Sequence, residues 1–127
     1  TAGDTISPLE WYALIMYSKG YVGNNMHPIV TSIANGVPFY CFDNYGIPKI
    51  DGQWTNGESS KIYHILSAAD LLKYRVFISG QDYSPTSAST VMDAILSFDA
   101  VKEKAFAVRY YQSYSNMMIQ VLNQLKK

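Results

Sequence analysis

The chain has 127 residues, of which 48% are hydrophobic and 14% aromatic, a composition typical of one folded domain with a single core. Ten basic and ten acidic side chains cancel, and no basic block stands out. The sequence therefore lacks the electrostatic footprint of a protein that binds nucleic acid or an anionic membrane surface. It also lacks an apolar stretch of the roughly 18 to 20 residues that a membrane-spanning helix needs.

Cysteine usage fits a reducing compartment. Cys41 is the single cysteine and lies inside an apolar run, so an internal disulfide and a cysteine-based zinc cluster are both excluded. We expect this thiol to be buried and inert, and the protein to be cytoplasmic.

The first elements have clear start and stop signals. Ser7, Pro8 and Glu10 form a capping box with proline in the first turn, which predicts a helix to about Ser18. A very short strand is expected over residues 21–23. Apolar residues at helical spacing then predict a second helix, which Gly36 closes as a C-terminal cap.

Residues 37–42 are apolar throughout, as expected for a strand buried on both faces of a parallel sheet. Residues 44–57 have no periodicity and predict a long loop, after which Glu58-Ser59-Ser60 opens a third helix and residues 75–78 form the next strand. This alternation predicts a doubly wound, Rossmann-like α/β domain with three layers and a small parallel sheet.

Two helices complete the expected fold. A polar connection over residues 81–89 leads into a short helix over 87–97, and Asp99 caps a last helix of about 25 residues. Apolar side chains follow this last helix in steps of three and four, from Val101 to Leu125. We expect this stripe to pack on the core; the alternative is that part of it docks on a second domain or subunit.

Ligands of parallel α/β sheets bind beyond the carboxyl ends of the strands, which selects residues 24–27 and 43–61. His27 lies in the first turn of the second helix, where free backbone amides and the helix dipole attract an anion. Its imidazole is suited to donate to a phosphate or carboxylate, or to act as a general acid. The alternative is that His27 only packs against the neighbouring loop.

The second place combines Lys49 in the loop with Ser59, Ser60 and Lys61 at a helix start. Hydroxyl groups, helix amides and an ammonium group together resemble a phosphate cradle without a Walker glycine pattern. The alternative is that Ser59 is a plain helix cap. The sequence contains no spacing typical of metal ligands, so no metal is expected.

Three stretches of the sequence resemble one known family. They are Tyr21-Val22-Gly23-Asn24-Asn25-Met26-His27-Pro28-Ile29, Ala34-Asn35-Gly36-Val37-Pro38 running on to Phe42-Asp43-Asn44-Tyr45-Gly46 and Lys49, and Ser59-Ser60-Lys61-Ile62-Tyr63. They resemble the C-terminal half of the polysaccharide pyruvyl transferase family. The resemblance covers residues 4–78. The helical segment that follows them resembles the family only in its general helical character.

The resemblance implies an architecture similar to the C-terminal half of a GT-B fold. It implies an activity that moves the enolpyruvyl-derived group of phosphoenolpyruvate to a sugar of a cell-surface polysaccharide, with phosphoenolpyruvate as donor substrate and no separate cofactor. His27 takes the place of the family histidine, which contacts the donor. Asn25 stands where the family has an arginine, which leaves open an altered donor, an arginine supplied from elsewhere, or lost activity.

The family also has an N-terminal domain that forms the other wall of the cleft. The resemblance therefore implies that residues 1–127 form a single domain from the C-terminal part of a longer two-domain protein, inactive by itself. Two other functions stay open: a GT-B-type glycosyltransferase domain that uses a nucleotide-sugar donor, and a non-catalytic or degenerate domain that docks through its helical tail.

Overall fold

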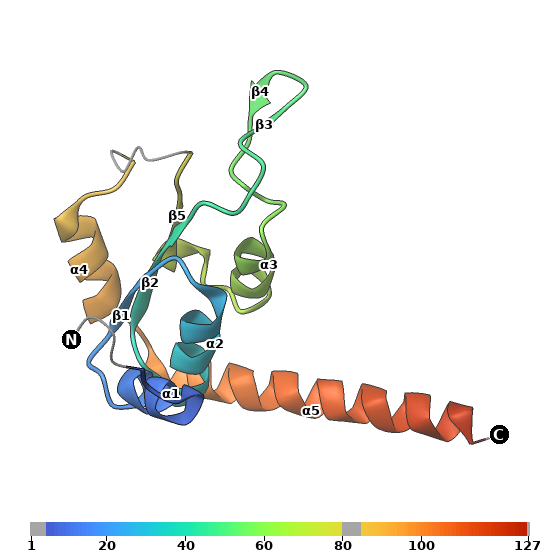
Figure 1. The fold of residues 1–127 in the computed structure, drawn as a ribbon. Helices are drawn as coiled ribbons and strands as arrows, with labels where there is room; N and C mark the ends of the chain where they lie inside the picture. The colour runs from blue at the N-terminus through green and yellow to red at the C-terminus, as the bar shows by residue number, and fades with distance from the viewer. Residues whose placement is uncertain (1–4, 80–84, 127) are drawn as a thin grey trace.

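The structure is a computed structural model that describes residues 5–79 and 85–126 (Figure 1). Its centre is a parallel sheet of three strands, β1 (Tyr21–Gly23), β2 (Phe39–Asp43) and β5 (Arg75–Phe77), in the order β1-β2-β5. In this sheet Tyr21 lies opposite Phe39, and Asp43 lies opposite Phe77. The predicted parallel pairing of short strands that alternate with helices is confirmed.

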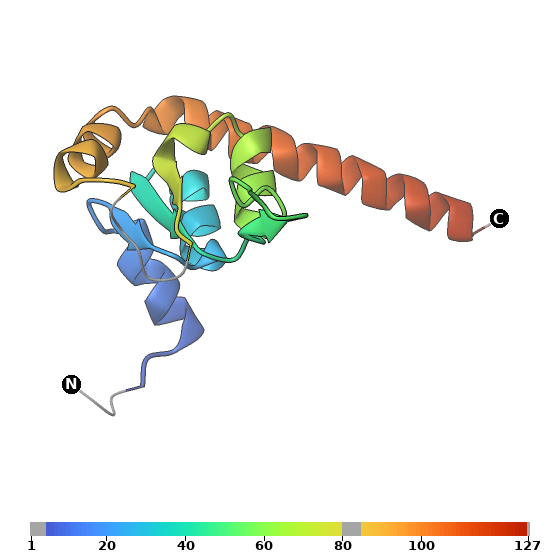
Figure 2. The ribbon, with the colours of Figure 1, turned by 90° about the horizontal axis from the view of Figure 1, so that it is seen from above.

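Helices cover both faces of the sheet, as a three-layer domain requires. Helix α2 (Met26–Asn35) joins β1 to β2, and α3 (Lys61–Ala68) with the 3₁₀ helix η1 (Leu72–Tyr74) joins β2 to β5. Figures 1 and 2 show the sheet between α4 (Ala88–Leu96) on one side and α2 and α3 on the other. Helix α1 (Pro8–Met16) packs against α2.

The core lies where α2, α3 and the central strand meet. Apolar residues recur at helical spacing on α2 and α3, so each helix turns one apolar stripe toward β2. Phe39 and Cys41 of β2 are fully buried, since this strand has a neighbour on each side and helices above and below. The buried cluster comprises Ile29, Ile33, Phe39, Cys41, Ile62, Leu66, Ala69, Leu71 and Tyr74.

Most of the predicted helix caps are confirmed. The side chains of Ser7 and Asp99 each accept a hydrogen bond from a backbone amide in the first turn of the following helix. Ser87, for which no cap was predicted, does the same at the start of α4. The cap of α3 is Ser60, whose Oγ accepts from the amides of Ile62 and Tyr63. The alternative that made Ser59 the cap is therefore wrong by one residue.

The region expected to be an irregular loop contains a β-hairpin, made of β3 (Lys49–Ile50) and β4 (Gln53–Trp54). Its two-residue turn is Asp51-Gly52, and both residues have positive φ angles, of 50° and 79°. Two positive φ angles in succession are typical of a type I′ turn, which Asp-Gly favours. That dipeptide was the sequence signal for the hairpin.

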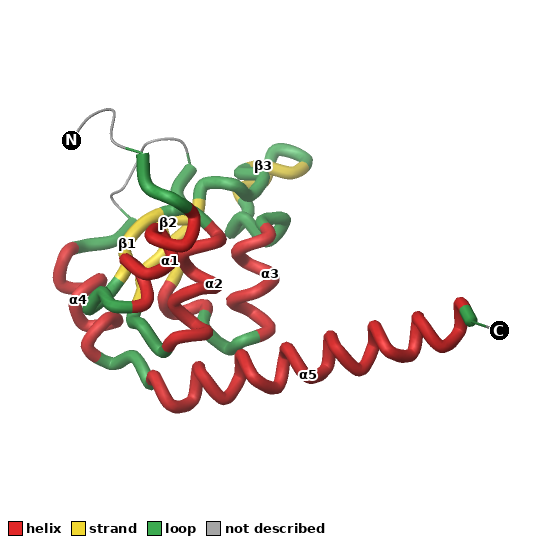
Figure 3. Tube along the Cα trace, turned by 60° about the horizontal axis from the view of Figure 1, so that its bottom comes forward, coloured by secondary structure: helices red, strands yellow, loops and turns green. Residues whose placement is uncertain are grey.

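The long helix α5 (Ala100–Leu125) forms as predicted, but the expectation that its apolar stripe packs on the core is wrong. Within the described part of the chain, its first turns pack on the body, with Glu103 buried and with Phe106 and Ala107 against the core cluster. A helix of 26 residues is about 39 Å long, far longer than the ten-residue helix α2 that it packs against. Figures 1 and 3 show α5 extending past the body, and Val101 and Tyr111 are 79% and 71% exposed.

The described residues contain neither a helix suited to span a membrane nor a cluster of metal ligands. Within residues 5–79 and 85–126, none of the helices has both the length and the apolar character needed to cross a bilayer. The same residues bring together no cluster of histidine, cysteine and acidic side chains able to hold a metal ion. Part of the predicted polar connection, residues 81–84, lies outside the described residues.

Candidate functional site

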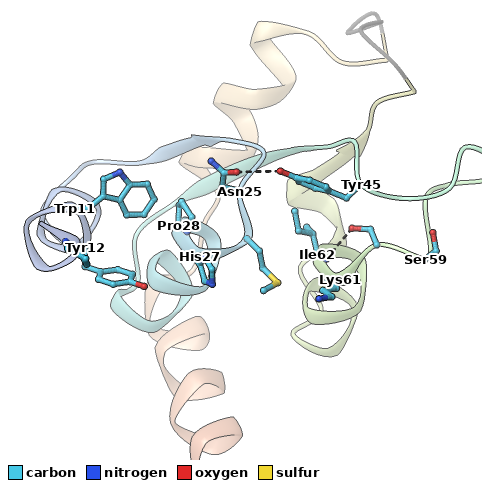
Figure 4. A pocket seen from close by; sticks show the side chains of 12 residues that line it. Trp11, Tyr12, Asn25, His27, Pro28, Tyr45, Ser59, Lys61 and Ile62 are labelled. Atoms are coloured by element: carbon cyan, nitrogen blue, oxygen red, sulfur yellow. Dashed lines mark hydrogen bonds between the residues drawn. The ribbon is translucent and has the colours of Figure 1, made fainter. Parts of the chain in front are cut away.

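A pocket of about 780 Å³ lies at the carboxyl ends of β1 and β2 (Figure 4). Four segments build it: the beginning of α1, the beginning of α2, the residues after β2, and the beginning of α3. Its volume falls within the range of about 300 to 1,000 Å³ that is usual for small-molecule sites. The lining residues are Pro8, Trp11, Tyr12, Asn25, Met26, His27, Pro28, Tyr45, Ser59, Ser60, Lys61 and Ile62.

The two places selected from the sequence meet in this pocket. Asn25 and His27 line it from the start of α2, and Ser59, Ser60 and Lys61 line it from the start of α3. More than 30 residues separate the two groups along the chain. They meet because β1 and β2 are parallel neighbours, so the segments that follow them emerge at the same edge of the sheet.

The first turn of α2 presents backbone amides that its own cap does not occupy. Asn25 is the cap residue, but its side chain makes no capping hydrogen bond. Its Oδ1 instead accepts from the hydroxyl of Tyr45 at 3.5 Å, and its backbone N–H donates to the hydroxyl of Tyr21 at 3.4 Å. The positive end of the α2 dipole therefore faces the pocket beside the exposed His27.

The phenol of Tyr21 holds this first turn in place through its hydrogen bond with the backbone N–H of Asn25. Burial raises the pKa of Tyr21, although the hydrogen bond from the Asn25 amide acts in the opposite direction. The phenol therefore stays neutral over the physiological pH range and keeps both its donor and its acceptor function. It fixes the turn between β1 and α2 without adding negative charge beside the pocket.

The start of α3 differs because its serines already bind backbone amides. The Oγ of Ser60 accepts from Ile62 at 3.1 Å, and the Oγ of Ser59 accepts from the Ile47 amide at 2.8 Å. Each hydroxyl keeps one hydrogen that it can donate to a ligand. Lys61 is exposed and adds an ammonium group on this side of the pocket.

Lys49 lies elsewhere. It belongs to β3 of the hairpin, and its Nζ lies 4.1 Å from the centre of the Trp54 ring, a cation–π arrangement. It does not contribute to the lining of the pocket. Of the predicted site residues, the structure thus brings together all except Lys49.

Neither arginine reaches the pocket. Arg75 is buried, with its side chain 3% exposed, and its Nε lies 2.8 Å from Oδ2 of Asp43. Arg109 lies on the exposed side of α5. Among the described residues the cationic groups of the lining are therefore Lys61 and, when protonated, His27. An arginine from elsewhere in the described part of this chain does not replace the one missing at Asn25.

Sequence reasoning missed the aromatic side of the pocket. Trp11 recurs at helical spacing on the apolar face of α1, which predicts a place in the core, yet it lines the pocket together with Tyr12 and Pro8. Only Ile15 of this helix is fully buried. The sequence around a tryptophan does not show whether the side chain lies in the core or lines a pocket, because both environments favour aromatic side chains.

The sequence profile of the polysaccharide pyruvyl transferase family matches residues 3–45. This match confirms the resemblance over the segment that runs from α1 to Tyr45 and contains Asn25 and His27, and it does not reach Ser59 or Lys61. No curated protein and no solved structure shows significant similarity to the chain. The likeness to a GT-B fold therefore stays a prediction, whereas the small parallel sheet and long terminal helix are established.

Proposed function

We propose, from the profile match over residues 3–45, that this domain forms the donor side of a polysaccharide pyruvyl transferase. Its substrates would be phosphoenolpyruvate and a saccharide of a cell-surface polysaccharide. The observation that carries the proposal is that His27, the uncapped start of α2 and Lys61 face one pocket. A multiply charged anion next to a histidine fits that arrangement.

The donor anion would lie between the two helix starts. The amides of Met26 and His27 and the ammonium group of Lys61 are the positive groups available there. The hydroxyls of Ser59 and Ser60 add two hydrogen-bond donors. Phosphoenolpyruvate has a phosphate and a carboxylate, so one group can bind at α2 while the other binds at Lys61.

His27 would act as the general acid. In the first step the imidazolium of His27 gives its proton to C3 of phosphoenolpyruvate, which becomes a methyl group, and a hydroxyl of the saccharide adds to C2 while its own proton returns to the imidazole. In the second step phosphate leaves with the C2–O bonding electrons, another hydroxyl of the saccharide adds to C2, and its proton passes to the departing phosphate. The product is a pyruvate ketal plus inorganic phosphate.

Asn25 gives this pocket a neutral amide where the family has an arginine. Because its Oδ1 is engaged with Tyr45, the side chain braces the loop after β2. We expect Asn25→Arg to increase the affinity for phosphoenolpyruvate, since a guanidinium binds a carboxylate or phosphate through two charge-assisted hydrogen bonds. Unchanged affinity in Asn25→Arg, together with no effect of His27→Ala, would favour a docking domain.

The test is a titration of the ¹⁵N-labelled chain with phosphoenolpyruvate, followed by amide chemical shifts. We expect saturable shifts at residues 25–27 and 59–62, and weaker binding in His27→Gln and Lys61→Met. His64→Gln and Lys49→Met are matched controls, because both residues lie outside the pocket lining. Equal losses in the controls, or no saturable shift in the unaltered chain, would contradict the proposal.

A nucleotide-sugar donor is the closest rival and uses the same crevice. Uridine diphosphate is the probe for it, because phosphoenolpyruvate and a nucleoside diphosphate should not both protect the same amides. Saturable shifts with uridine diphosphate alone would indicate a glycosyltransferase domain. Formation of a pyruvate ketal by this chain alone would contradict the expectation that another domain completes the cleft.

Docking through α5 is a second candidate role, favoured by its exposed apolar side chains. Tyr111, Leu122 and Leu125 are 71%, 51% and 76% exposed, and no charged residue lies between positions 110 and 125. We infer that this face packs against a further domain of the same protein. Size-exclusion chromatography with light scattering tests this: a monomer is expected, and a stable dimer would show that a second copy covers the helix instead.

A further inference from the structure

The pocket is chemically divided. Figure 4 shows Trp11 and Tyr12 on one side and Ser59 and Lys61 on the other, with Asn25 and His27 between them. Figures 1 and 3 show the same order at the level of helices, with α2 between α1 and α3. The positive groups proposed to hold the donor anion therefore occupy only one part of the lining, and the part formed by α1 is apolar.

The two aromatic rings on α1 form a corner. Their centres lie 6.1 Å apart and their planes meet at 84°. Trp11 is half-buried and Tyr12 is 39% exposed, so both keep surface that a ligand can cover. Rigid rings offer contact area at a small entropic cost, because an aromatic side chain has only two rotatable bonds to fix.

We propose that Trp11 and Tyr12 form the saccharide subsite of this pocket, with a pyranose ring stacked on the indole of Trp11. This inference rests on the proposed function, which requires a sugar beside the donor. The C–H groups on one face of a pyranose carry partial positive charge and are attracted to the negative face of an aromatic ring. Binding an anion against these rings would be unfavourable, because the charge would lose its hydration without gaining a polar partner. The apolar face of a neutral sugar loses little on the same surface.

The groups beside the aromatic corner suit the polar edge of the same sugar. Asn25 and His27 lie next to it in the lining and can bond ring hydroxyls, and the hydroxyl of Tyr12 adds a further donor and acceptor. A sugar held there has its hydroxyls directed toward the middle of the pocket, where His27 lies. That is the position a nucleophilic hydroxyl needs if the donor is bound near Lys61.

The chain allows a direct test because it has two tryptophans, Trp11 and Trp54. In Trp54→Phe the tryptophan fluorescence of the chain, excited at wavelengths that tyrosine does not absorb, comes from Trp11 alone. Trp54 is 68% exposed in the hairpin, so this change leaves the pocket intact. The probe is methyl β-D-galactopyranoside, which has a continuous apolar face. We expect a saturable change in Trp11 emission and, by ligand-observed NMR, at least a tenfold loss of affinity in Trp11→Ala, about 1.4 kcal/mol.

The control is Trp11→Phe with Trp54 retained, whose emission should not respond to the sugar. Tyr12→Ser serves as a second variant and should weaken binding even if Trp11→Ala fails to fold. If the sugar leaves Trp11 emission and the amides of residues 11–12 and 25–27 unchanged while phosphoenolpyruvate binds, the inference is wrong and the proposed donor site stands. If the sugar binds through Trp11 but phosphoenolpyruvate does not bind, the subsite stands and the proposed function fails.

One further outcome overturns the inference. A nucleobase also stacks on indole, so uridine is titrated under the same conditions. Saturable quenching by uridine, with no response to the galactoside, would assign the aromatic corner to a nucleotide. In that case Trp11 serves the donor of a glycosyltransferase and not a saccharide acceptor.

Discussion

Arg75 and Asp43 form an ion pair inside the domain, with 2.8 Å between Nε and Oδ2, and their side chains are 3% and 0% exposed. The pair ties the end of β2 to the start of β5. Oδ1 of Asp43 also accepts from the amide of Tyr45, and Arg75 donates to the carbonyl of Gly57. Both ends of the segment that carries Tyr45 toward the pocket are therefore fixed by these two side chains.

Replacing Arg75 with Met should strongly destabilise the domain. The change leaves the carboxylate of Asp43 buried without its counter-ion, which typically costs about 3–5 kcal/mol. Urea denaturation followed by circular dichroism measures the loss. The double variant Asp43→Asn with Arg75→Met is the control, and it should be less destabilised than Arg75→Met alone; equal losses would show that the buried charge is not the cause.

Replacing Gly46 with Ala should also destabilise the domain. A Cβ on Gly46 would overlap the backbone of Gly57, which cannot move aside as the end of a flexible side chain can. We expect a loss of about 1–3 kcal/mol and altered amide shifts at Tyr45 and Ser59. Gly20→Ala is the matched control, because a Cβ there meets Pro38 O at an ordinary 3.4 Å.

Glu103 should make the domain less stable as the pH rises. Glu103 is 2% exposed, and its Oε2 has no hydrogen-bond partner among the residues that the structure describes. Burial raises its pKa above the ordinary 4.5, a shift that Asp99 and Asp70 reinforce and Lys102 and Lys73 oppose. Between the unfolded and the folded pKa the folded state binds more protons, so the free energy of unfolding falls with rising pH there. Below pH 4.5 the stabilisation is complete.

Glu103→Gln tests this directly. The amide has no charge to desolvate, so we expect a higher melting temperature at pH 7 than in the unaltered chain, and a flatter dependence of stability on pH above 4.5. Thermal melts at pH 5, 6 and 7 measure both. A lower melting temperature in Glu103→Gln at pH 7 would mean that the carboxylate has a stabilising partner.

Cys41 should resist thiol reagents in the folded domain. It is 0% exposed, and burial together with the nearby Asp43 raises its pKa to about 12, so almost no thiolate forms at pH 8. Labelling with a chromogenic disulfide should proceed only as fast as the domain opens, and urea should accelerate it. Immediate labelling without urea would contradict the buried position in the central strand.

Two aromatic residues of α5 should respond differently to truncation. Phe106 packs on the core, whereas Tyr111 is 71% exposed. We expect Phe106→Ala to lower the free energy of unfolding by about 2–4 kcal/mol, and Tyr111→Ala to lower it by less than about 0.5 kcal/mol. Chemical denaturation of the two variants measures both changes. A large loss of stability in Tyr111→Ala would show that the outer part of α5 is buried against another surface.

Local signals predicted much of the fold and part of the site. The caps Ser7 and Asp99 and the continuous apolar run of β2 are written in adjacent residues, so their elements follow from short-range chemistry. The parallel order of the sheet followed from the alternation of helices and strands, and it brought His27 and Lys61 to one edge. The hairpin had its signal in Asp51-Gly52, which the turn geometry now explains.

The tertiary structure alone decided which apolar faces are covered. Helical spacing places residues on a face, but spacing cannot tell whether a neighbour exists to bury that face. For this reason Trp11 lines a pocket instead of the core, the outer stripe of α5 stays exposed, and Glu103 is the residue of α5 that is buried. Local residues therefore determined the helices and strands, whereas the packing of these elements determined which of their faces are buried and which stay exposed.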